Sequence, residues 1–294
     1  MLRTSMGLKT VQDPDALRRE LDLLCGAGFD TADLDFSMPG QLELLHDPAC
    51  EARLLKAADI LNEYRFPIYM AHAPYHPHVF NDLEKEALLN EEILLSIPAA
   101  AIVHAENLVA HPYEGLTLDD PLCQDWDAAM RKNVEMYTEL VEKGKKLGVH
   151  ICTENLFAMD GWHTRCYPCF SSYSRNLNRV MDAVPGLHVC LDFGHAILSK
   201  QDPAQLARDF GPRLSALHLH NNNRVTDLHL APLQNTAAPW EEFCAALAEI
   251  GYTGSVNMEV GGFAANTPAE LRPAAYAYLH ASCAWLAERA DGRK

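Results

Sequence analysis

The sequence lacks any long apolar stretch. No uninterrupted apolar run approaches the roughly 18 residues that a membrane-spanning helix needs, so we expect no membrane segment. The first ten residues, MLRTSMGLKT, also lack the apolar core of a secretion signal. The nine cysteines are scattered and odd in number, which is typical of reduced thiols. These absences predict a cytoplasmic protein.

Positive charge is also scarce. The chain has 24 Lys and Arg against 40 Asp and Glu, which gives a formal net charge of −16. Proteins that bind nucleic acid need a basic surface, because phosphate contacts supply most of their affinity. We see no cluster of Lys or Arg that would build one. We therefore expect a small-molecule substrate and no nucleic-acid partner. The sequence is compatible with a homo-oligomer but does not decide the oligomeric state.

Short apolar stretches alternate with amphipathic ones along the whole chain. The expected strands are 4–8, 31–36, 67–73, 108–111, 149–154, 187–192, 214–220 and 255–259. The expected helices are 13–25, 50–64, a long one from 82 that is perturbed at Pro98, 126–147, 176–184, 203–210, 240–250 and 268–289. Parallel strands need crossover helices, and eight such units close into a barrel. We therefore predict an α/β fold, a (βα)8 TIM barrel, as one domain over residues 1–294.

Acids and histidines follow the predicted strands or lie in the loop after strand seven. They are His72, His111, Glu154, Asp192, His195, His220, Asp227, His229 and Glu259. One such residue alone is usually a capping or hydrogen-bonding residue. A whole rim of them at the edge of a core is costly unless they are paired or bound to metal. The pattern predicts one to three divalent ions (Zn, Mn or Co) at the barrel mouth, where such folds carry their chemistry.

The local spacing of these residues suggests which of them act together. His218 and His220 are two apart on a strand and point to the same face. His220 is the better ligand, whereas His218 lies one layer deeper as a substrate contact or a core histidine. Asp192 and His195, three apart, can address two different ions, and Asp227 and His229 can reach one ion together. Glu154 and Glu259 are expected from strands four apart, on opposite walls.

Several motifs make the chain similar to a known group. The motifs are HAPY at 72–75, AHP at 110–112, TENL at 153–156, LDFGHA at 191–196, LHLHNNNRVTDLHL at 217–230 and NMEV at 257–260. Together they resemble the xylose isomerase-like superfamily of TIM barrels, which contains sugar isomerases, epimerases and the endonuclease IV group. The resemblance implies, in the epimerase branch, a single-metal site at Glu154, Asp192, His220 and Glu259. In the endonuclease IV branch it implies a three-zinc site that adds the other five residues of the rim.

The sequence departs from that superfamily in one loop. After DLHL the superfamily commonly has a glycine-rich turn, and here the sequence reads APLQNTAAPW. The position after His220 is often Asp in the superfamily and is Asn221 here. Both changes lie in the loop that faces the substrate, so they leave the substrate class open and do not affect the ligand set.

Two enzymatic hypotheses and one binding hypothesis fit these residues. The first is a metal-dependent isomerase or epimerase of a small sugar, keto-sugar or polyol, with Glu154 and Glu259 as catalytic base and acid. The alternative is a multi-zinc phosphoesterase of the endonuclease IV type that acts on a small phosphoester rather than DNA. The third is a barrel that binds metal or sugar without turnover. The ligand count favours hydrolysis, whereas the acidic charge favours sugar chemistry, and we rank the isomerase or epimerase first.

The long loops should set specificity. The candidate substrate-binding residues are His76, His195, His218, Arg224 and Trp162, with His78, His163 and Arg165 as further loop candidates. Each of the loop residues would otherwise be an ordinary exposed side chain. Cys166 and Cys169 form a CxxC pair, for which a redox or zinc role competes with that of two incidental loop thiols; we favour the latter.

Overall fold

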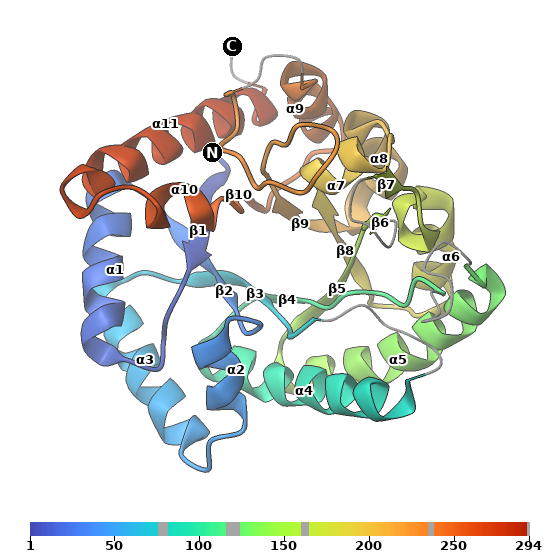
Figure 1. The fold of residues 1–294 in the computed structure, drawn as a ribbon, viewed down its shortest axis with the longest axis horizontal. Helices are drawn as coiled ribbons and strands as arrows, with labels where there is room; N and C mark the ends of the chain where they lie inside the picture. The colour runs from blue at the N-terminus through green and yellow to red at the C-terminus, as the bar shows by residue number, and fades with distance from the viewer. Residues whose placement is uncertain (76–81, 116–123, 160–164, 235–237, 293–294) are drawn as a thin grey trace.

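Eight parallel strands curl around a common axis in the computed structural model, and helices surround them (Figure 1). The structure describes residues 1–75, 82–115, 124–159, 165–234 and 238–292. The strands are β1 (Arg3–Leu8), β2 (Thr31–Asp35), β3 (Ile68–His72), β4 (Asn107–Val109), β5 (His150–Glu154), β8 (His188–Asp192), β9 (Leu214–His218) and β10 (Ser255–Met258). Their order is β10-β1-β2-β3-β4-β5-β8-β9.

The ring closes between its first and last strands. Leu219 forms a parallel bridge with Met258. The Leu219 N–H donates to the Asn257 carbonyl at 2.9 Å, and the Glu259 N–H donates to the Leu219 carbonyl at 3.1 Å. The predicted (βα)8 barrel is therefore confirmed.

One outer helix follows each strand of the barrel, and all but the last connect it to the next strand. They are α1 (Pro14–Ala27), α3 (Cys50–Tyr64), α4 (Leu83–Ile102), α5 (Trp126–Leu147), α6 (Ser174–Ala183), α8 (Pro203–Phe210), α9 (Trp240–Glu249) and α11 (Arg272–Ala290). Aspartate side chains cap the first turns of α1, α5 and α8, because Asp13, Asp125 and Asp202 accept backbone N–H groups there. Gly28 and Gly148 end α1 and α5 in the left-handed conformation that glycine adopts most easily.

Several short elements depart from the predicted alternation. The structure adds helices α2 (Pro39–Leu45), α7 (Phe193–Leu198) and α10 (Gly261–Ala265), and the expected loop 155–174 contains the hairpin β6 (Ala158–Met159) and β7 (Cys166–Tyr167). Gly26 lies inside α1, and α4 continues through Pro98. The predicted strands at 108–111, 214–220 and 255–259 were too long at their ends. His111, His220 and Glu259 consequently lie just beyond regular strand geometry, where loop backbone can aim them.

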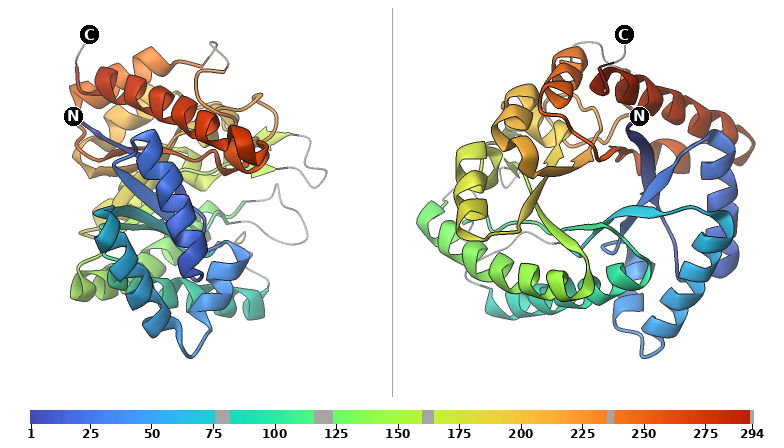
Figure 2. Two further views of the ribbon diagram at one scale, coloured as in Figure 1. Left: turned by 90° about the vertical axis from the view of Figure 1, so that its left-hand side faces the viewer. Right: turned by 180° about the vertical axis from the view of Figure 1, so that it is seen from behind.

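The interior of the barrel changes character along its axis. A small apolar cluster of Tyr69, Met70, Val109, Cys152, Cys190 and Ala216 fills its middle. Above that cluster, towards the carboxyl ends of the strands, the inward side chains become charged. Figure 2 shows the barrel from the side and from behind. In the described part of the chain, no helix is both long and apolar enough to cross a membrane.

Candidate metal centre

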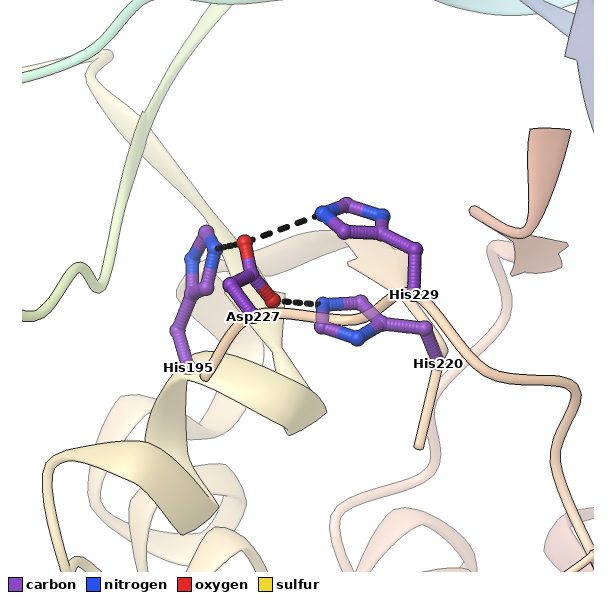
Figure 3. Close-up of side chains that lie close together, drawn as sticks. All are labelled: His195, His220, Asp227 and His229. Atoms are coloured by element: carbon purple, nitrogen blue, oxygen red, sulfur yellow. Dashed lines mark hydrogen bonds and ion pairs between the residues drawn. The ribbon is translucent and has the colours of Figure 1, made fainter. Parts of the chain in front are cut away.

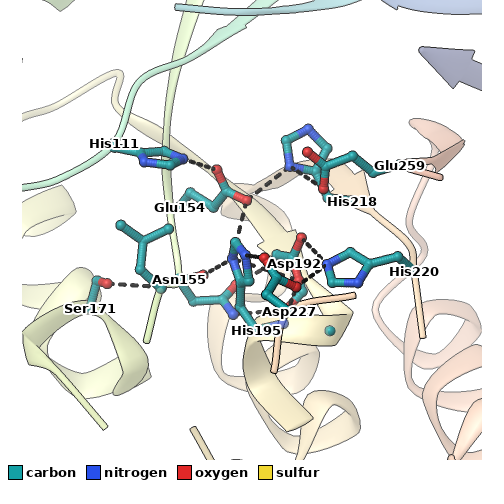
Figure 4. Close-up of polar contacts among 12 residues, drawn as sticks. His111, Glu154, Asn155, Ser171, Asp192, His195, His218, His220, Asp227 and Glu259 are labelled. Atoms are coloured by element: carbon teal, nitrogen blue, oxygen red, sulfur yellow. Dashed lines mark hydrogen bonds and ion pairs between the residues drawn. The ribbon is translucent and has the colours of Figure 1, made fainter. Parts of the chain in front are cut away.

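Glu154 is the central carboxylate of the barrel mouth. It ends β5 and is only 1% exposed. Its Oε2 lies 3.4 Å from His72 Nε2 and 3.2 Å from His111 Nε2. Its Oε1 lies 2.9 Å from His218 Nδ1 and 3.7 Å from His195 Nδ1. One buried carboxylate therefore contacts four imidazoles that come from four different parts of the chain. Figure 4 shows three of them, His111, His195 and His218, around Glu154.

Asp192 occupies the end of β8, where it also caps α7. One carboxylate oxygen accepts the backbone N–H of His195, and the other, Oδ2, lies 3.2 Å from His220 Nε2. Two hydrogen bonds of 2.8 Å each join the Asn155 side-chain amide to the Asp192 backbone. The turn after β8 and its amide partner thus fix the orientation of this carboxylate.

A third carboxylate, Asp227, lies on the β9–α9 loop. The side chains of His195, His220 and His229 surround it (Figure 3). Its Oδ2 lies 3.0 Å from His229 Nε2 and 3.5 Å from His195 Nε2, and its Oδ1 lies 3.7 Å from His220 Nε2. The rings of His220 and His229 stack with centroids 4.0 Å apart. His229 adopts a positive φ of 45°, a strained conformation for a residue with a side chain, which indicates that the loop is held in this arrangement.

Glu259 follows β10 and completes the rim. Its Oε2 lies 3.8 Å from His218 Nδ1 and 3.7 Å from His229 Nδ1. The expectation that Glu154 and Glu259 come from strands four apart is wrong. Only β8 and β9 separate β5 from β10 around the ring, so the two strands are three apart. Both glutamates still face His218 Nδ1, and the two carboxylate oxygens are therefore no farther apart than the sum of their distances to that nitrogen.

All nine rim residues predicted from the sequence meet at the mouth. Their ligand atoms form overlapping groups in which every atom lies within 4.8 Å of the others. The groups are His72, His111 and Glu154; Glu154, Asp192 and His195; Asp192, His220 and Glu259; and His195, His220, Asp227 and His229. Carboxylate oxygens and imidazole nitrogens at this spacing suit Zn, Mn or Co.

Buried polar atoms without partners support this fit. Among the described residues, Glu154 Oε2, His220 Nδ1, Asp227 Oδ1 and Glu259 Oε2 are buried and have no hydrogen-bond partner. Such atoms are uncommon in proteins, and a bound ion or ligand would satisfy them. Every ion-pair partner found for the rim carboxylates in the described ranges is a histidine. The residues present therefore fit a cation that would neutralise these carboxylates.

The pKa values of the rim histidines also show that the carboxylates favour positive charge at the mouth. Burial alone would lower the pKa of His72, but Glu154 outweighs burial and raises it to about 9. Burial is likewise overcome at His195, where Asp192 and Asp227 raise the pKa to about 10, and at His229, where Glu259 and Asp227 raise it to about 9. His111 is the exception, because burial prevails there and lowers its pKa to about 4. The carboxylates therefore attract positive charge to the mouth.

The two glutamates differ in proton affinity. Burial would raise the pKa of Glu154, but His218, His111 and His72 together hold it well below its usual range. The pKa of Glu259 is raised, because burial and the charge of Asp192 outweigh the neighbouring histidines. Two carboxyl groups whose environments separate their pKa values are a common arrangement for an acid and a base.

Two residues of the site were missed from the sequence. Asp33 on β2 is 5% exposed, and its Oδ2 lies 3.3 Å from His218 Nε2. Gly194 lies so close to His220 that a Cβ at this position would overlap the imidazole ring. The alternation of T-A-D-L-D on a strand carried a weak signal for Asp33, and Gly194 gave none, because its role depends on a contact with another strand. His218 and His220 are both fully buried.

The proposed specificity residues are only partly placed. His76, His78, Trp162 and His163 lie outside the described residues. Arg224 adopts a positive φ of 64°, and its N–H donates to Asn222 Oδ1 at 2.8 Å.

Neither thiol of the CxxC pair forms a disulfide among the described residues. Cys166 donates to the Val225 carbonyl at 3.1 Å, which ties β7 to the loop of Asp227, while Cys169 Sγ lies 3.3 Å from Ser172 Oγ. The two thiols therefore have separate partners.

Comparisons with known proteins agree with the fold. A family model described as a xylose isomerase-like TIM barrel matches residues 21–283. The crystal structure of a D-tagatose 3-epimerase-like protein matches at TM-score 0.72 with 19% identity, over 97% of this chain and 99% of that one. A structure of D-psicose 3-epimerase in the presence of D-fructose matches at TM-score 0.71 with 16% identity, over 91% and 92%. At these identities the likeness shows a shared fold.

A match to a curated relative covers less of the chain. The uncharacterized protein Rv0498 of Mycobacterium tuberculosis is 36% identical over 84 residues, which is 28% of this chain and 30% of that protein. The chain thus spans less than a third of the length of the curated relatives it matches.

Proposed function

Because the chain belongs to the xylose isomerase-like TIM barrel family, we propose that it is a divalent-metal-dependent isomerase or epimerase of a small sugar, keto-sugar or polyol. The observation that carries the proposal is the convergence of Glu154 and Glu259 on one nitrogen, with Asp192 and His220 beside them. Moving a proton next to a carbonyl needs a base, an acid and stabilisation of the charge that develops on oxygen.

The chain supplies the proton-transfer groups. In this proposal Glu154, whose pKa is lowered, accepts the proton from the carbon next to the carbonyl. Glu259, whose pKa is raised and whose side chain is 31% exposed, is the group that returns a proton. In the same proposal His195 hydrogen-bonds a substrate oxygen. Glu154, Asp192, His220 and Glu259 would hold a divalent cation, which when bound polarises the carbonyl as a Lewis acid.

A second candidate function has its own observation. The group of His195, His220, Asp227 and His229 adjoins the first site, although a single-metal epimerase does not require it. With His72 and His111 it offers ligands for two further ions, as a zinc-dependent phosphoesterase would need to neutralise a phosphoryl group. The net charge of −16 favours a small phosphoester over DNA as the substrate of such an enzyme.

One experiment separates the two functions. The protein loaded with Mn, Co or Zn is incubated in deuterated water with a panel of ketoses and aldoses and, separately, with bis(p-nitrophenyl) phosphate. Proton transfer next to the carbonyl predicts deuterium incorporation at that carbon and the appearance of an epimer or isomer, both visible by NMR. The Glu154→Gln variant is expected to lose this exchange, because Glu154 is the group that removes the proton.

Hydrolysis of the phosphodiester without any exchange on the sugars would replace the first function by the second. Binding of metal with neither reaction on these panels would contradict both and favour a binding protein. Metal content gives an independent reading, since one ion per chain supports the epimerase and three zinc ions support the phosphoesterase.

A further inference from the structure

A chain of polar contacts crosses the barrel one layer below the mouth. Asn257 on β10 donates from Nδ2 to Asp33 Oδ2 on β2 at 3.1 Å. The same Asp33 oxygen lies 3.3 Å from Nε2 of His218 on β9. All three side chains are at least nine-tenths buried. We call these three residues the inner polar chain; they lie among apolar strand residues, where unpaired polar groups are costly.

The inner polar chain ends on both glutamates of the mouth. His218 Nδ1 lies 2.9 Å from Glu154 Oε1 and 3.8 Å from Glu259 Oε2. A carboxylate can only accept, so the shorter contact is a hydrogen bond that His218 donates. Without the imidazole, two carboxylates would face each other across a gap, and repulsion would turn them apart.

Asp33 has no contact with the rim carboxylates among the interactions found in the described residues. Its one ion-pair contact there is with His218. The contact is an ion pair, and a carboxylate beside the far nitrogen of an imidazole favours one orientation of the ring, as carboxylates do for histidines around metal sites. Asn257 in turn holds the Asp33 carboxylate. The position of His218 on β9, two residues before His220, keeps its ring on the same inward face but one layer deeper.

We propose that His218, oriented by Asp33, is the positioning residue that sets the spacing and direction of Glu154 and Glu259. The inference rests on the proposed role of these two glutamates and goes beyond it, because it places the determinant of their geometry on β2 and β9, below the ligand set. His218 and Asp33 touch neither metal nor substrate in this account. They act only through the glutamates.

The test uses Co²⁺ as a probe of geometry. Co²⁺ is titrated into the metal-free wild type and into the variants Asp33→Asn, His218→Asn and the double variant, and its affinity and visible absorption bands are recorded. Each single variant is expected to bind Co²⁺ about 10- to 100-fold more weakly and to change the band shape. Because Asp33 acts through His218, Asp33→Asn should add nothing in the His218→Asn background.

A matched control lies at the opposite end of the barrel. His188 is the first residue of β8, at the end of that strand remote from the mouth, and its Nδ1 lies 2.8 Å from Ser215 Oγ in a partly buried contact. His188→Asn should leave the Co²⁺ spectrum unchanged, and circular dichroism checks that every variant is folded. If His218→Asn misfolds, the milder Asp33→Asn variant still decides the question.

The proposal is overturned if both folded single variants give the wild-type spectrum and affinity, or if their effects add in the double variant. The outcome is independent of turnover. A wild type that epimerises no sugar, but whose Co²⁺ spectrum depends on Asp33 and His218 in this way, would contradict the proposed function and support the positioning role.

Discussion

The two ends of the barrel satisfy their charges differently. At the amino end, Arg3 pairs with Glu106 at 2.8 Å and lies over the Tyr69 ring at 4.2 Å, and the Tyr69 hydroxyl donates to the Ser215 carbonyl at 2.7 Å. At the carboxyl end, Glu154 meets only histidines, and one of its oxygens has no hydrogen-bond partner among the described residues. A fixed guanidinium completes the first arrangement, whereas the second is complete only when protons or a cation are supplied.

The comparison separates stability from function in this fold. In TIM barrels the amino end of the strands serves stability and the carboxyl end carries the chemistry. Arginine remains charged at any ordinary pH, so the amino end needs nothing from solution. Histidine exchanges its proton near neutrality and also binds metals, so the mouth responds to both. We therefore expect matched changes at the two ends to have very different consequences.

The largest contrast is expected between two Glu→Gln changes. Glu154→Gln removes the charge that four histidines share, and we expect turnover of the sugar substrate to fall by about 10²–10⁴-fold, the range of a lost general base. Glu106→Gln removes one partner of an exposed ion pair and should cost about 1 kcal/mol or less of stability. Steady-state kinetics and chemical unfolding measure the two effects. If Glu154→Gln and Glu106→Gln turned over the sugar equally fast, the proposed difference in function between the two ends of the barrel would be wrong.

Two glycine substitutions sharpen the comparison within the mouth. Gly194→Ala places a methyl group into the His220 ring, so His220 must move, and we expect metal affinity to fall by about 10- to 100-fold. Overpacking should also cost about 1–3 kcal/mol of stability. Gly26→Ala, on the exposed face of α1 with no atom near the new methyl group, should instead stabilise the protein by up to about 1 kcal/mol. Metal titration of both variants checks this, and unchanged affinity in Gly194→Ala would argue against His220 as a ligand.

The pH dependence should distinguish the metal-free from the metal-loaded protein. The raised pKa values of His72, His195 and His229, about 9 to 10, stabilise the metal-free fold fully below about pH 6.5. That contribution is lost as pH rises through 9 to 10. Metal must displace these protons, so its affinity should rise about tenfold per pH unit for each proton released.

The measurement for that prediction is the melting temperature with and without Zn²⁺ from pH 6.5 to 9.5. We expect the gap between the two curves to widen steadily with pH. A gap that stays constant over this range would mean that no histidine proton is exchanged for metal.

The smallest effect is expected in the loop beyond the rim. Arg224→Ala should raise KM a few-fold and leave kcat nearly unchanged, because a residue that contributes only uniform binding affects KM alone. Arg208→Ala, on an outer helix where Arg208 pairs with Glu249, is the control and should alter neither constant. An unchanged KM in Arg224→Ala would exclude this residue from substrate binding.

The sequence predicted the elements with strong local signals. The helices Cys50–Tyr64, Trp126–Leu147 and Pro203–Phe210 end where they were expected, because apolar spacing, aspartate caps and Gly148 mark most of their boundaries. Short helices were missed where Pro39 and Gly40 or Gly194 resemble loop signals. Their formation depends on tertiary contacts that no local pattern records.

The rim could be predicted because the fold sends every strand end to one place. Most rim residues lie at or just after the end of an apolar run, and Asp227 and His229 lie in the loop that follows one. Asp33 could not be selected, since its importance comes from His218 on a strand distant in sequence. Glu154 and Glu259 were predicted on strands four apart, whereas β8 and β9 alone separate β5 from β10, so their strands are three apart. Local sequence thus identified the residues, and only the three-dimensional arrangement showed how they are connected.

The central claim is that the carboxyl end of the barrel binds divalent cations through Glu154 and its neighbours. Its most direct test is elemental analysis after loading with Zn²⁺, Mn²⁺ or Co²⁺ and removal of free metal. The account predicts at least one tightly held ion per chain in the wild type and in Glu106→Gln, and a marked loss in Glu154→Gln. A wild-type protein that retains none of these ions, or a Glu154→Gln variant that retains as many as the wild type, would contradict it.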